Sequence, residues 1–372
     1  MASFDTDFPA DCFEFCPNEQ YQDIFVCGTY KLLDQASTST SENDPNTNLE
    51  GASAPQKRIG RCLAFRLAPN TSDGISFEKI HAFNLPAVLD MKWKWCPGSL
   101  DAPPTLAIAD SEGSITVHEW RESVFAQTDA VRCAPRDTLV LSIDWSNRRA
   151  EGPASLVASL SDGRLCILRP TEAGKLAVTD TWHAHDYEPW VAAWNYWDTN
   201  IIYSGGDDLK LKAWDVRQGF DSPVFVNKRF DAGVTSIQTH PHVEHLLAVG
   251  SYNNTVKLFD TRKLSAPITE VDVGGGAWRV KWHPSKARTH DLLVASMHDG
   301  FKVVRFAPTT PDATATAPWG NFLGPAAIIS RKDNHESMAY GADWAHGAPR
   351  ADGTTVVGGC SFYDHKMSVW AA

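Results

Sequence analysis

Two stretches of the chain, residues 204–217 and 249–262, repeat one pattern without a gap at a spacing of 45 residues. Each reads as a strand-like segment, a tight turn and an alternating segment that ends in an aromatic residue, Asp, any residue and Arg. The turns carry Asp-Asp and Asn-Asn pairs, whose side chains bond to nearby backbone and tolerate left-handed conformations. A period of about 40 to 45 residues with four strands per unit is typical of a β-propeller.

Weaker copies of this pattern account for most of the remaining chain. Each copy opens with an apolar segment that ends near an aromatic residue, a proline or a turn. The seven openings lie at residues 12–17, 89–97, 141–145, 191–194, 235–241, 278–284 and 340–344. The apolar residues alternate or run in short groups, without the period of a helix. We therefore predict an all-β fold, a seven-bladed WD-repeat β-propeller in which residues 1–372 form a single domain.

The two ends of the chain complement each other in this scheme. The last repeat stops at its third strand, at residues 367–370. Residues 3–8 belong to no other repeat, so we expect them to supply the missing outer strand, which closes the ring and removes its free edges.

Two insertions are rich in small and polar residues. Residues 35–57 are predicted to be a disordered loop inside the first blade, and residues 307–318 a low-complexity connector.

Composition and charge narrow the classes of function. The formal net charge of −11 argues against nucleic acid or an anionic membrane as a partner, because both need a basic surface. The eight cysteines include no CxxC pair, which makes disulfides or a zinc site a poor expectation. The N-terminal residues lack the features of a signal peptide, and no apolar run is long enough for a membrane helix. We predict a reduced, cytoplasmic, monomeric protein without a metal.

A set of four polar and aromatic residues in the fourth repeat has two interpretations. WD blades often contain a relay of His, Ser or Thr, Asp and Trp, and the matching places hold His183 or His185, Ser204, Asp208 and Trp214. The same residue types occur in the triad of a serine hydrolase. The relay is favoured because it satisfies buried polar groups, and because no Gly-x-Ser-x-Gly elbow exposes a serine.

Residues that the repeat does not require gather in the connections between strands. The loop into each inner strand and the turn between the second and third strands often meet at one end of a propeller channel. Acidic, imidazole and aromatic residues of these segments are found at 185–190, Asp207, Tyr252, Trp278, Arg279, His298, 335–340 and 362–365. Convergent groups of these kinds predict a binding pocket, and solvated loop decoration is the alternative for each single residue.

The same segments carry a family resemblance. The motifs at 184–197, 203–208, 275–284, 337–344 and 360–365 resemble the eukaryotic WD-repeat family of diphthine methyl ester esterases, the diphthamide biosynthesis protein 7 family. The first half of the chain agrees chiefly in the layout of its repeats. The resemblance implies a carboxyl methylesterase without a cofactor, whose protein substrate is translation elongation factor 2. The side chain it acts on is a modified histidine with a methyl ester and a trimethylammonium group.

Ester hydrolysis needs a nucleophile, a base and hydrogen-bond donors for the oxyanion, and a trimethylammonium group favours aromatic faces. The candidates are His298 and His185 as the base, Glu188 and Asp207 as residues that orient it, Arg279 and Tyr340 as oxyanion donors, and Trp190, Tyr252, Trp278 and Tyr363 as an aromatic wall. Cys360 is a rival nucleophile, but its place at a strand end predicts a buried thiol.

Two functions without catalysis are the alternatives. Scaffolding is a common use of WD propellers, and the same residues would then bind a protein partner. The segments 214–217 and 259–262 also fit, fully or in part, the Trp-Asp-x-Arg pattern of substrate receptors for cullin ubiquitin ligases. That pattern is short and frequent among WD proteins.

Overall fold

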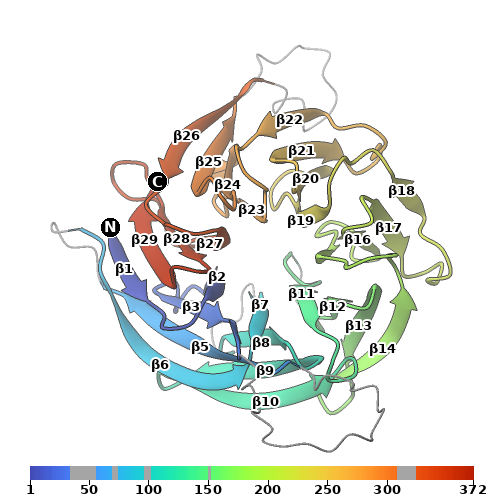
Figure 1. Cartoon of the computed structure of the whole chain (residues 1–372), viewed down its shortest axis with the longest axis horizontal. Helices are drawn as coiled ribbons and strands as arrows, with labels where there is room; N and C mark the ends of the chain where they lie inside the picture. The colour runs from blue at the N-terminus through green and yellow to red at the C-terminus, as the bar shows by residue number, and fades with distance from the viewer. Residues whose placement is uncertain (34–55, 69–73, 96–101, 150–151, 308–323) are drawn as a thin grey trace, which may run out of the picture.

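The computed structural model describes residues 1–33, 56–68, 74–95, 102–149, 152–307 and 324–372. Within these residues the strands form seven sheets, arranged as a ring around a central channel (Figure 1). The predicted all-β propeller is confirmed. The loop predicted at 35–57 and the connector predicted at 307–318 lie outside the described residues, except for residues 56, 57 and 307.

The strands of the first four blades run from the channel outward. The first blade contains β2 (Ala10–Phe15), β3 (Ile24–Thr29), β4 (Lys31–Leu32), β5 (Arg58–Leu67) and β6 (Phe77–Pro86). The second contains β7 (Val88–Trp93), β8 (Thr105–Asp110), β9 (Ser114–Arg121) and β10 (Val124–Arg132). The third contains β11 (Val140–Trp145), β12 (Leu156–Leu160), β13 (Arg164–Pro170) and β14 (Leu176–His183). The fourth contains β15 (Val191–Trp194), β16 (Ile201–Gly205), β17 (Leu211–Asp215) and β18 (Phe225–Asn227).

The remaining blades complete the ring. The fifth contains β19 (Val234–Thr239), β20 (Leu246–Ser251), β21 (Thr255–Asp260) and β22 (Thr269–Asp272). The sixth contains β23 (Arg279–Trp282), the short 3-10 helix η1 (Lys286–Arg288), β24 (Asp291–Ala295), β25 (Phe301–Phe306) and β26 (Ala326–Lys332). The seventh contains β27 (Ala339–Trp344), β28 (Val356–Ser361) and β29 (Lys366–Ala371), and its outer strand is β1 (Ala2–Asp5) from the other end of the chain.

The N-terminal strand closes the ring as predicted. β1 pairs antiparallel with β29, with Ala2 opposite Val369 and Asp5 opposite Lys366. The blade that contains the C-terminus therefore depends on the first residues of the chain. Figure 1 shows the two ends beside each other in this blade. The closure removes the free sheet edges that an open ring would expose.

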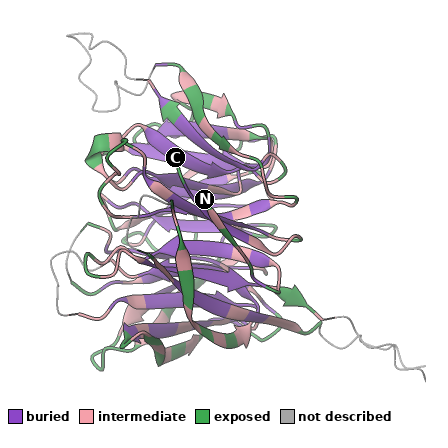
Figure 2. Ribbon diagram, turned by 90° about the vertical axis from the view of Figure 1, so that its left-hand side faces the viewer, coloured by how far each residue is buried: buried purple, intermediate pink, exposed green. Residues whose placement is uncertain are grey.

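The core lies between neighbouring blades, where the middle strands are almost completely buried (Figure 2). Five tryptophans near the ends of inner strands belong to it: Trp93, Trp145, Trp194, Trp282 and Trp344. Two of their indoles also connect adjacent blades. Trp145 Nε1 donates a hydrogen bond to the Lys92 carbonyl at 3.1 Å, and Trp344 Nε1 donates to the Lys281 carbonyl at 2.9 Å. These bonds fix the angle between blades as well as burying the rings.

Acidic side chains connect inner strands across the channel wall. One edge of each inner strand faces the channel, so its backbone N–H groups lack a strand partner. Carboxylates of a neighbouring blade accept hydrogen bonds from three of these groups: Asp90 from Ile143 N (3.0 Å), Asp144 from Trp194 N (2.9 Å) and Asp343 from Phe15 N (2.9 Å). Asp90, Asp144 and Asp343 therefore have a structural role.

Candidate active site

The residues of the predicted relay meet in the fourth blade. His185 Nε2 lies 2.7 Å from Ser204 Oγ, and His185 Nδ1 lies 2.8 Å from Asp208 Oδ1. Trp214 Nε1 donates to Ser204 Oγ at 2.9 Å. The side chain of His185 is fully buried, and burial lowers its pKa although Asp208 opposes the shift. The structural interpretation therefore holds for this set, and we withdraw His185 as a candidate base because water cannot reach it.

A second relay occupies the seventh blade. His335 Nδ1 lies 2.5 Å from Ser361 Oγ, and His335 Nε2 lies 2.9 Å from Ser368 Oγ. Ser361 also bonds to Asp364. Burial lowers the pKa of His335 to about 4, so its imidazole is neutral at physiological pH. His335 is therefore explained by the scaffold in the same way as His185.

Four aromatic side chains converge at the channel end where the inner strands begin. The ring centroids of Trp190 and Trp278 are 5.4 Å apart, and Tyr252 lies 6.4 Å from Trp190 and 5.9 Å from Trp278. Tyr340 continues the array at 4.9 Å from Trp278. All four side chains are half-buried. We call this array, Trp190, Tyr252, Trp278 and Tyr340, the aromatic mouth.

Asp207 adjoins one side of the aromatic mouth. Its Oδ1 accepts a hydrogen bond from Trp190 Nε1 at 2.7 Å, which fixes the orientation of the indole. Gly233 makes this arrangement possible, because a Cβ at that position would collide with Asp207 Oδ1 and press on the Tyr252 ring. Burial raises the pKa of Asp207, and the bond from Trp190 opposes the shift.

Three other predicted residues lie at the edge of this region. Glu188 is exposed, and its backbone carbonyl accepts the hydrogen bond from Asp207 N. Tyr363 is 66% exposed and reaches the aromatic mouth only through Phe362, whose ring lies 5.4 Å from that of Tyr340. His298 is exposed in the turn between β24 and β25. Among the described residues, no hydrogen bond, ion pair or ring contact holds its imidazole in place.

The inner strands carry β-bulges at this end of the channel. Each bulge adds a residue that pairs with nothing across the sheet and redirects a side chain. The pairing shifts at Asp11 in β2, Leu89 in β7, Leu141 in β11, Thr235 in β19 and Tyr340–Gly341 in β27. Trp190 and Trp278 directly precede the two remaining inner strands, β15 and β23. Asp11 is thus the acidic counterpart of residues that form the aromatic mouth, and the sequence interpretation missed it.

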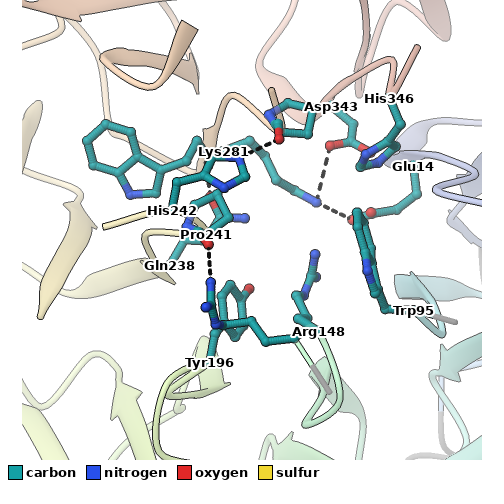
Figure 3. Close-up of a pocket in the computed structure, with 13 residues that line it drawn as sticks. Glu14, Trp95, Arg148, Tyr196, Gln238, Pro241, His242, Lys281, Asp343 and His346 are labelled. Carbon is teal, nitrogen blue, oxygen red and sulfur yellow. Dashed lines mark hydrogen bonds and ion pairs between the residues drawn. The ribbon is translucent and has the colours of Figure 1, made fainter. Parts of the chain in front are cut away.

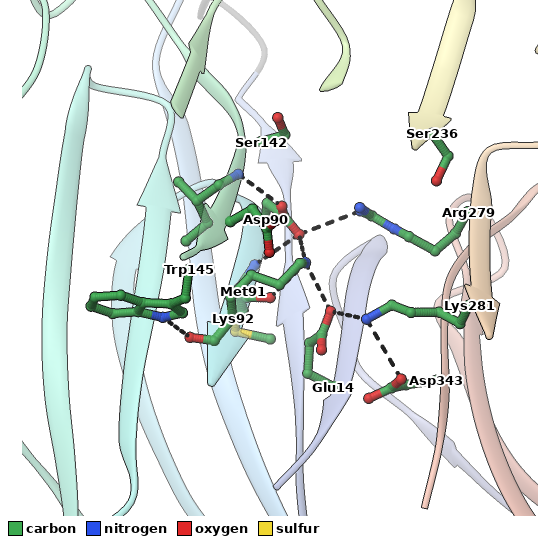
Figure 4. Close-up of polar contacts among 12 residues, drawn as sticks. Glu14, Asp90, Met91, Lys92, Ser142, Trp145, Ser236, Arg279, Lys281 and Asp343 are labelled. Atoms are coloured by element: carbon green, nitrogen blue, oxygen red, sulfur yellow. Dashed lines mark hydrogen bonds and ion pairs between the residues drawn. The ribbon is translucent and has the colours of Figure 1, made fainter. Parts of the chain in front are cut away.

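A chain of charges lines the channel below the aromatic mouth (Figure 4). Arg279 Nη2 lies 3.4 Å from Asp90 Oδ1, and the guanidinium-bearing side chain is 16% exposed. Lys92 Nζ bridges Asp90 Oδ1 at 2.6 Å and Glu14 Oε1 at 2.8 Å. Arg279 is therefore the cation of this network that lies nearest the start of an inner strand, with part of its side chain accessible.

A cavity of about 260 Å³ opens at the opposite end of the channel (Figure 3). Lys281 Nζ lies 2.7 Å from Glu14 Oε1 and 3.5 Å from Asp343 Oδ1. Burial raises the pKa of Asp343 to about 6, against the charge of Lys281. Arg148 stacks over Tyr196, with its guanidinium carbon 5.0 Å from the ring centroid. The predicted site residues do not line this cavity, which we call the opposite cavity.

The described cysteines provide no exposed thiol. All seven are buried and unbridged, and Cys360 has no accessible surface. Burial raises the pKa of Cys360 well above its ordinary value, so its thiol is a poor nucleophile.

In the described part of the chain, no group of three or more potential ligands is placed to hold a metal ion. The same residues include no helix with the length and apolar character to span a membrane.

The arginines of the two Trp-Asp-x-Arg-like segments are engaged inside their own turns. Arg217 donates to both carboxylate oxygens of Asp215, at 2.8 and 2.6 Å. Arg262 makes the same paired contact with Asp260, at 2.9 and 2.7 Å. These bonds give both arginines a role in the blade itself, which weakens the pattern as a sign of a ligase receptor.

Comparison with known proteins places the chain in a family. No protein-family model matches it. It is 36% identical to the diphthine methyltransferase of Mus musculus, across 93% of this chain and 69% of the relative, and 34% identical to that of Homo sapiens, across 93% and 74%. A diphthine methyltransferase homolog of Dictyostelium discoideum is 31% identical, across 98% and 96%.

The fold has counterparts among solved structures as well. A chain of the crystal structure of the mitotic checkpoint complex superposes with a TM-score of 0.66, across 100% of this chain and 91% of that chain. Its sequence identity is 14%, so this likeness concerns the fold alone. The similarity to the diphthine methyltransferases, in contrast, extends over nearly the whole sequence, and the chain belongs to the diphthine methyltransferase family.

Proposed function

We propose that this protein is a carboxyl methylesterase of diphthamide biosynthesis, which hydrolyses the methyl ester of diphthine on translation elongation factor 2. Membership of the diphthine methyltransferase family supports the substrate. The observation that carries the proposal is the aromatic mouth, because four half-buried rings beside an acid suit a substrate that combines a permanent cation with an ester.

The aromatic mouth divides into two parts with different chemistry. Trp190, Tyr252 and Trp278 lie beside Asp207 and present ring faces and a negative charge to the trimethylammonium group. Tyr340 and Arg279 lie beyond Trp278, where their donors can stabilise the oxyanion of the ester carbonyl. Glu188, His298 and Tyr363 lie at the exposed edge, where they contact the protein that carries diphthine.

The charges of the opposite cavity make it a poorer site for this substrate. Arg148, Arg149 and Lys281 line it, and they repel a permanent cation. The carboxylates of Glu14 and Asp343 already pair with Lys281. The aromatic mouth therefore suits the substrate better.

The reaction is tested on the methylated substrate itself. The full chain is incubated with elongation factor 2 that carries diphthine methyl ester, without a methyl donor. We expect methanol in solution and the loss of one CH2 unit from the mass of the factor. A methyltransferase would instead add a methyl group to diphthine when S-adenosylmethionine is supplied. A scaffold or a ligase receptor would bind the factor and give neither product.

The remaining expectations follow from this substrate. The partner is a protein, elongation factor 2, and the site of action is the cytoplasm, where translation factors work. A monomer suffices, because every residue of the proposed site comes from one chain. Size-exclusion chromatography with light scattering, run with and without the factor, tests the monomer directly.

A further inference from the structure

We propose that Asp11 is the general base of the ester hydrolysis, an inference that rests on the proposed esterase function. Asp11 is the unpaired residue of the bulge in β2, between the pairs Ala10–Thr29 and Cys12–Gly28. Tyr340 has the corresponding place in β27. A bulge at the start of an inner strand turns its side chain out of the sheet, which places Asp11 at the aromatic mouth.

Close packing of two blades brings Asp11 beside the proposed oxyanion donors. β27 approaches β2 so closely that a Cβ on Gly341 would lie 2.7 Å from the Cys12 carbonyl carbon. Burial raises the pKa of Tyr340, the residue before Gly341, and the negative charge of Asp11 raises it further. Arg279 also interacts electrostatically with Asp11. A base, a phenol and a guanidinium thus share one side of the aromatic mouth.

Asp11 differs from the other acids of the channel in having no structural task. Asp90 accepts a hydrogen bond from Ile143 N and pairs with Lys92 and Arg279. Asp207 accepts from Trp190. Among the described residues, no hydrogen bond or ion pair engages the half-buried carboxylate of Asp11. An acid that is partly removed from water and left without a partner costs stability, and such residues are characteristic of functional sites.

The proton affinity of Asp11 suits a base at physiological pH. Burial raises the pKa of its carboxyl to about 8, Arg279 opposes the shift and Asp90 adds to it. The other titratable groups facing it are Tyr340 from β27 and the buried thiols of Cys12, Cys27 and Cys360, which are neutral at this pH. A catalytic base is most effective when its pKa lies near the working pH.

The proposed reaction balances without a cofactor. The Asp11 carboxylate removes a proton from a water molecule, whose oxygen forms a bond to the ester carbonyl carbon. The resulting oxyanion is held by Arg279 and Tyr340. The tetrahedral intermediate breaks its bond to the methoxy oxygen, and protonated Asp11 returns the proton to that oxygen. The products are methanol and the free carboxylate of diphthine, whose own acidic proton is released to solvent.

The test compares the full-length protein with Asp11→Asn on methylated elongation factor 2. We expect kcat to fall by about 10²- to 10⁴-fold, the contribution of a general base, with little change in KM. For the unaltered protein, kcat/KM should rise with pH and level off above about pH 8. Asp137→Asn, which changes an exposed acid in the loop before β11, is the matched control and should keep full activity.

The outcomes separate this inference from the proposed function. If the unaltered protein releases no methanol, the esterase function fails. If it releases methanol and Asp11→Asn does so equally fast, the esterase stands and Asp11 is not its base. A thermal unfolding midpoint of Asp11→Asn at or above that of the unaltered protein excludes misfolding as the cause of lost activity. A kcat/KM that does not change between about pH 6 and pH 9 would also overturn the assignment, because a base of this pKa must titrate there.

Discussion

The two ends of the central channel use charge in opposite ways. At the opposite cavity, Glu14 pairs with both Lys92 and Lys281, and Asp343 accepts from Phe15 N while it faces Lys281. At the aromatic mouth, Asp11 has no hydrogen bond or ion pair among the described residues. Neutralised charges hold the scaffold together, whereas an acid left without a partner is available for chemistry.

The difference has its origin in the geometry of the inner strands. Toward the opposite cavity these strands are regular, and their acids reach the free N–H groups of the next blade. Toward the aromatic mouth the pairing breaks at bulges, which release one side chain per strand from the repeat. The repeat therefore dictates the residues at one end of the channel and leaves those at the other end free to specialise.

Removing a cation from the opposite cavity should have the largest effect, and it should be on stability. Lys281→Met leaves Glu14 with Lys92 alone and removes the ion-pair partner of Asp343. We expect the free energy of unfolding to fall by about 3 to 5 kcal/mol, because removing one partner of a buried ion pair leaves the other charge buried and unpaired. Chemical denaturation followed by tryptophan fluorescence measures the change.

A matched change in the same cavity serves as the control. Arg149 also lines this cavity, but it is exposed and pairs with no carboxylate among the described residues, so Arg149→Met should cost about 1 kcal/mol or less. Folded Lys281→Met protein should keep the esterase activity of the unaltered protein. A loss of activity without a loss of stability would place the chemistry in the opposite cavity and reverse the comparison.

Removing a ring from the aromatic mouth should act on substrate binding. Trp278 contacts Trp190, Tyr252 and Tyr340, so it is the centre of the array. We expect Trp278→Ala to raise KM for methylated elongation factor 2 by about 5- to 30-fold, the range of a cation–π contact. Trp95→Ala, at the opposite cavity, is the control and should leave KM unchanged. If Trp95→Ala raised KM and Trp278→Ala did not, the substrate would bind at the opposite cavity and the assignment to the aromatic mouth would be refuted.

The sequence predicts the fold better than it predicts the site. The 45-residue repeat and the seven openings are enough to identify the blades, and residues 3–8 are enough to anticipate β1. Trp190, Tyr252 and Trp278 were also predicted together, because loops of neighbouring blades meet at one end of a propeller. These successes share one cause, since each follows from repeat geometry that is visible as spacing along the chain.

The residues that the sequence does not resolve are those whose role depends on local pairing. His185 was a candidate base because it begins the polar segment 185–190, and the sequence alone does not decide whether His183 or His185 is buried in the relay. Asp11 was missed because the first inner strand was predicted to open at residue 12, whereas β2 begins at Ala10 and bulges at Asp11. The alternation of apolar residues does not reveal a bulge. An alignment of the repeats that places Asp11 opposite Tyr340 would have revealed it.

Neutralising Asp207 should have a smaller effect than removing a ring. In Asp207→Asn, the amide oxygen can still accept the hydrogen bond from Trp190 Nε1, so the indole keeps its orientation while the negative charge is lost. We expect KM to rise by about fivefold with kcat unchanged, as for one charge acting on a cation near the protein surface. Asp231→Asn, an exposed acid in the loop before β19, controls for net charge. An equal rise in both variants would mean that Asp207 acts only through long-range attraction.

A further effect concerns the pH dependence of stability, and it isolates the cost of leaving Asp11 without a partner. Its pKa of about 8 lies above the ordinary value, so the folded chain binds this proton more tightly than the unfolded chain does. The stability gained from that proton is present at low pH and is lost as pH rises toward 8. Asp11→Asn has no such proton, so its unfolding midpoint should match that of the unaltered protein near pH 3, below the ordinary pKa of an aspartate, and exceed it by a few degrees near pH 9. Differential scanning calorimetry of the two proteins measures the difference, in which all other titrating groups cancel. A difference that stays constant with pH would mean that Asp11 is solvated like any surface acid, and the contrast between the two ends of the channel would then lose its energetic basis.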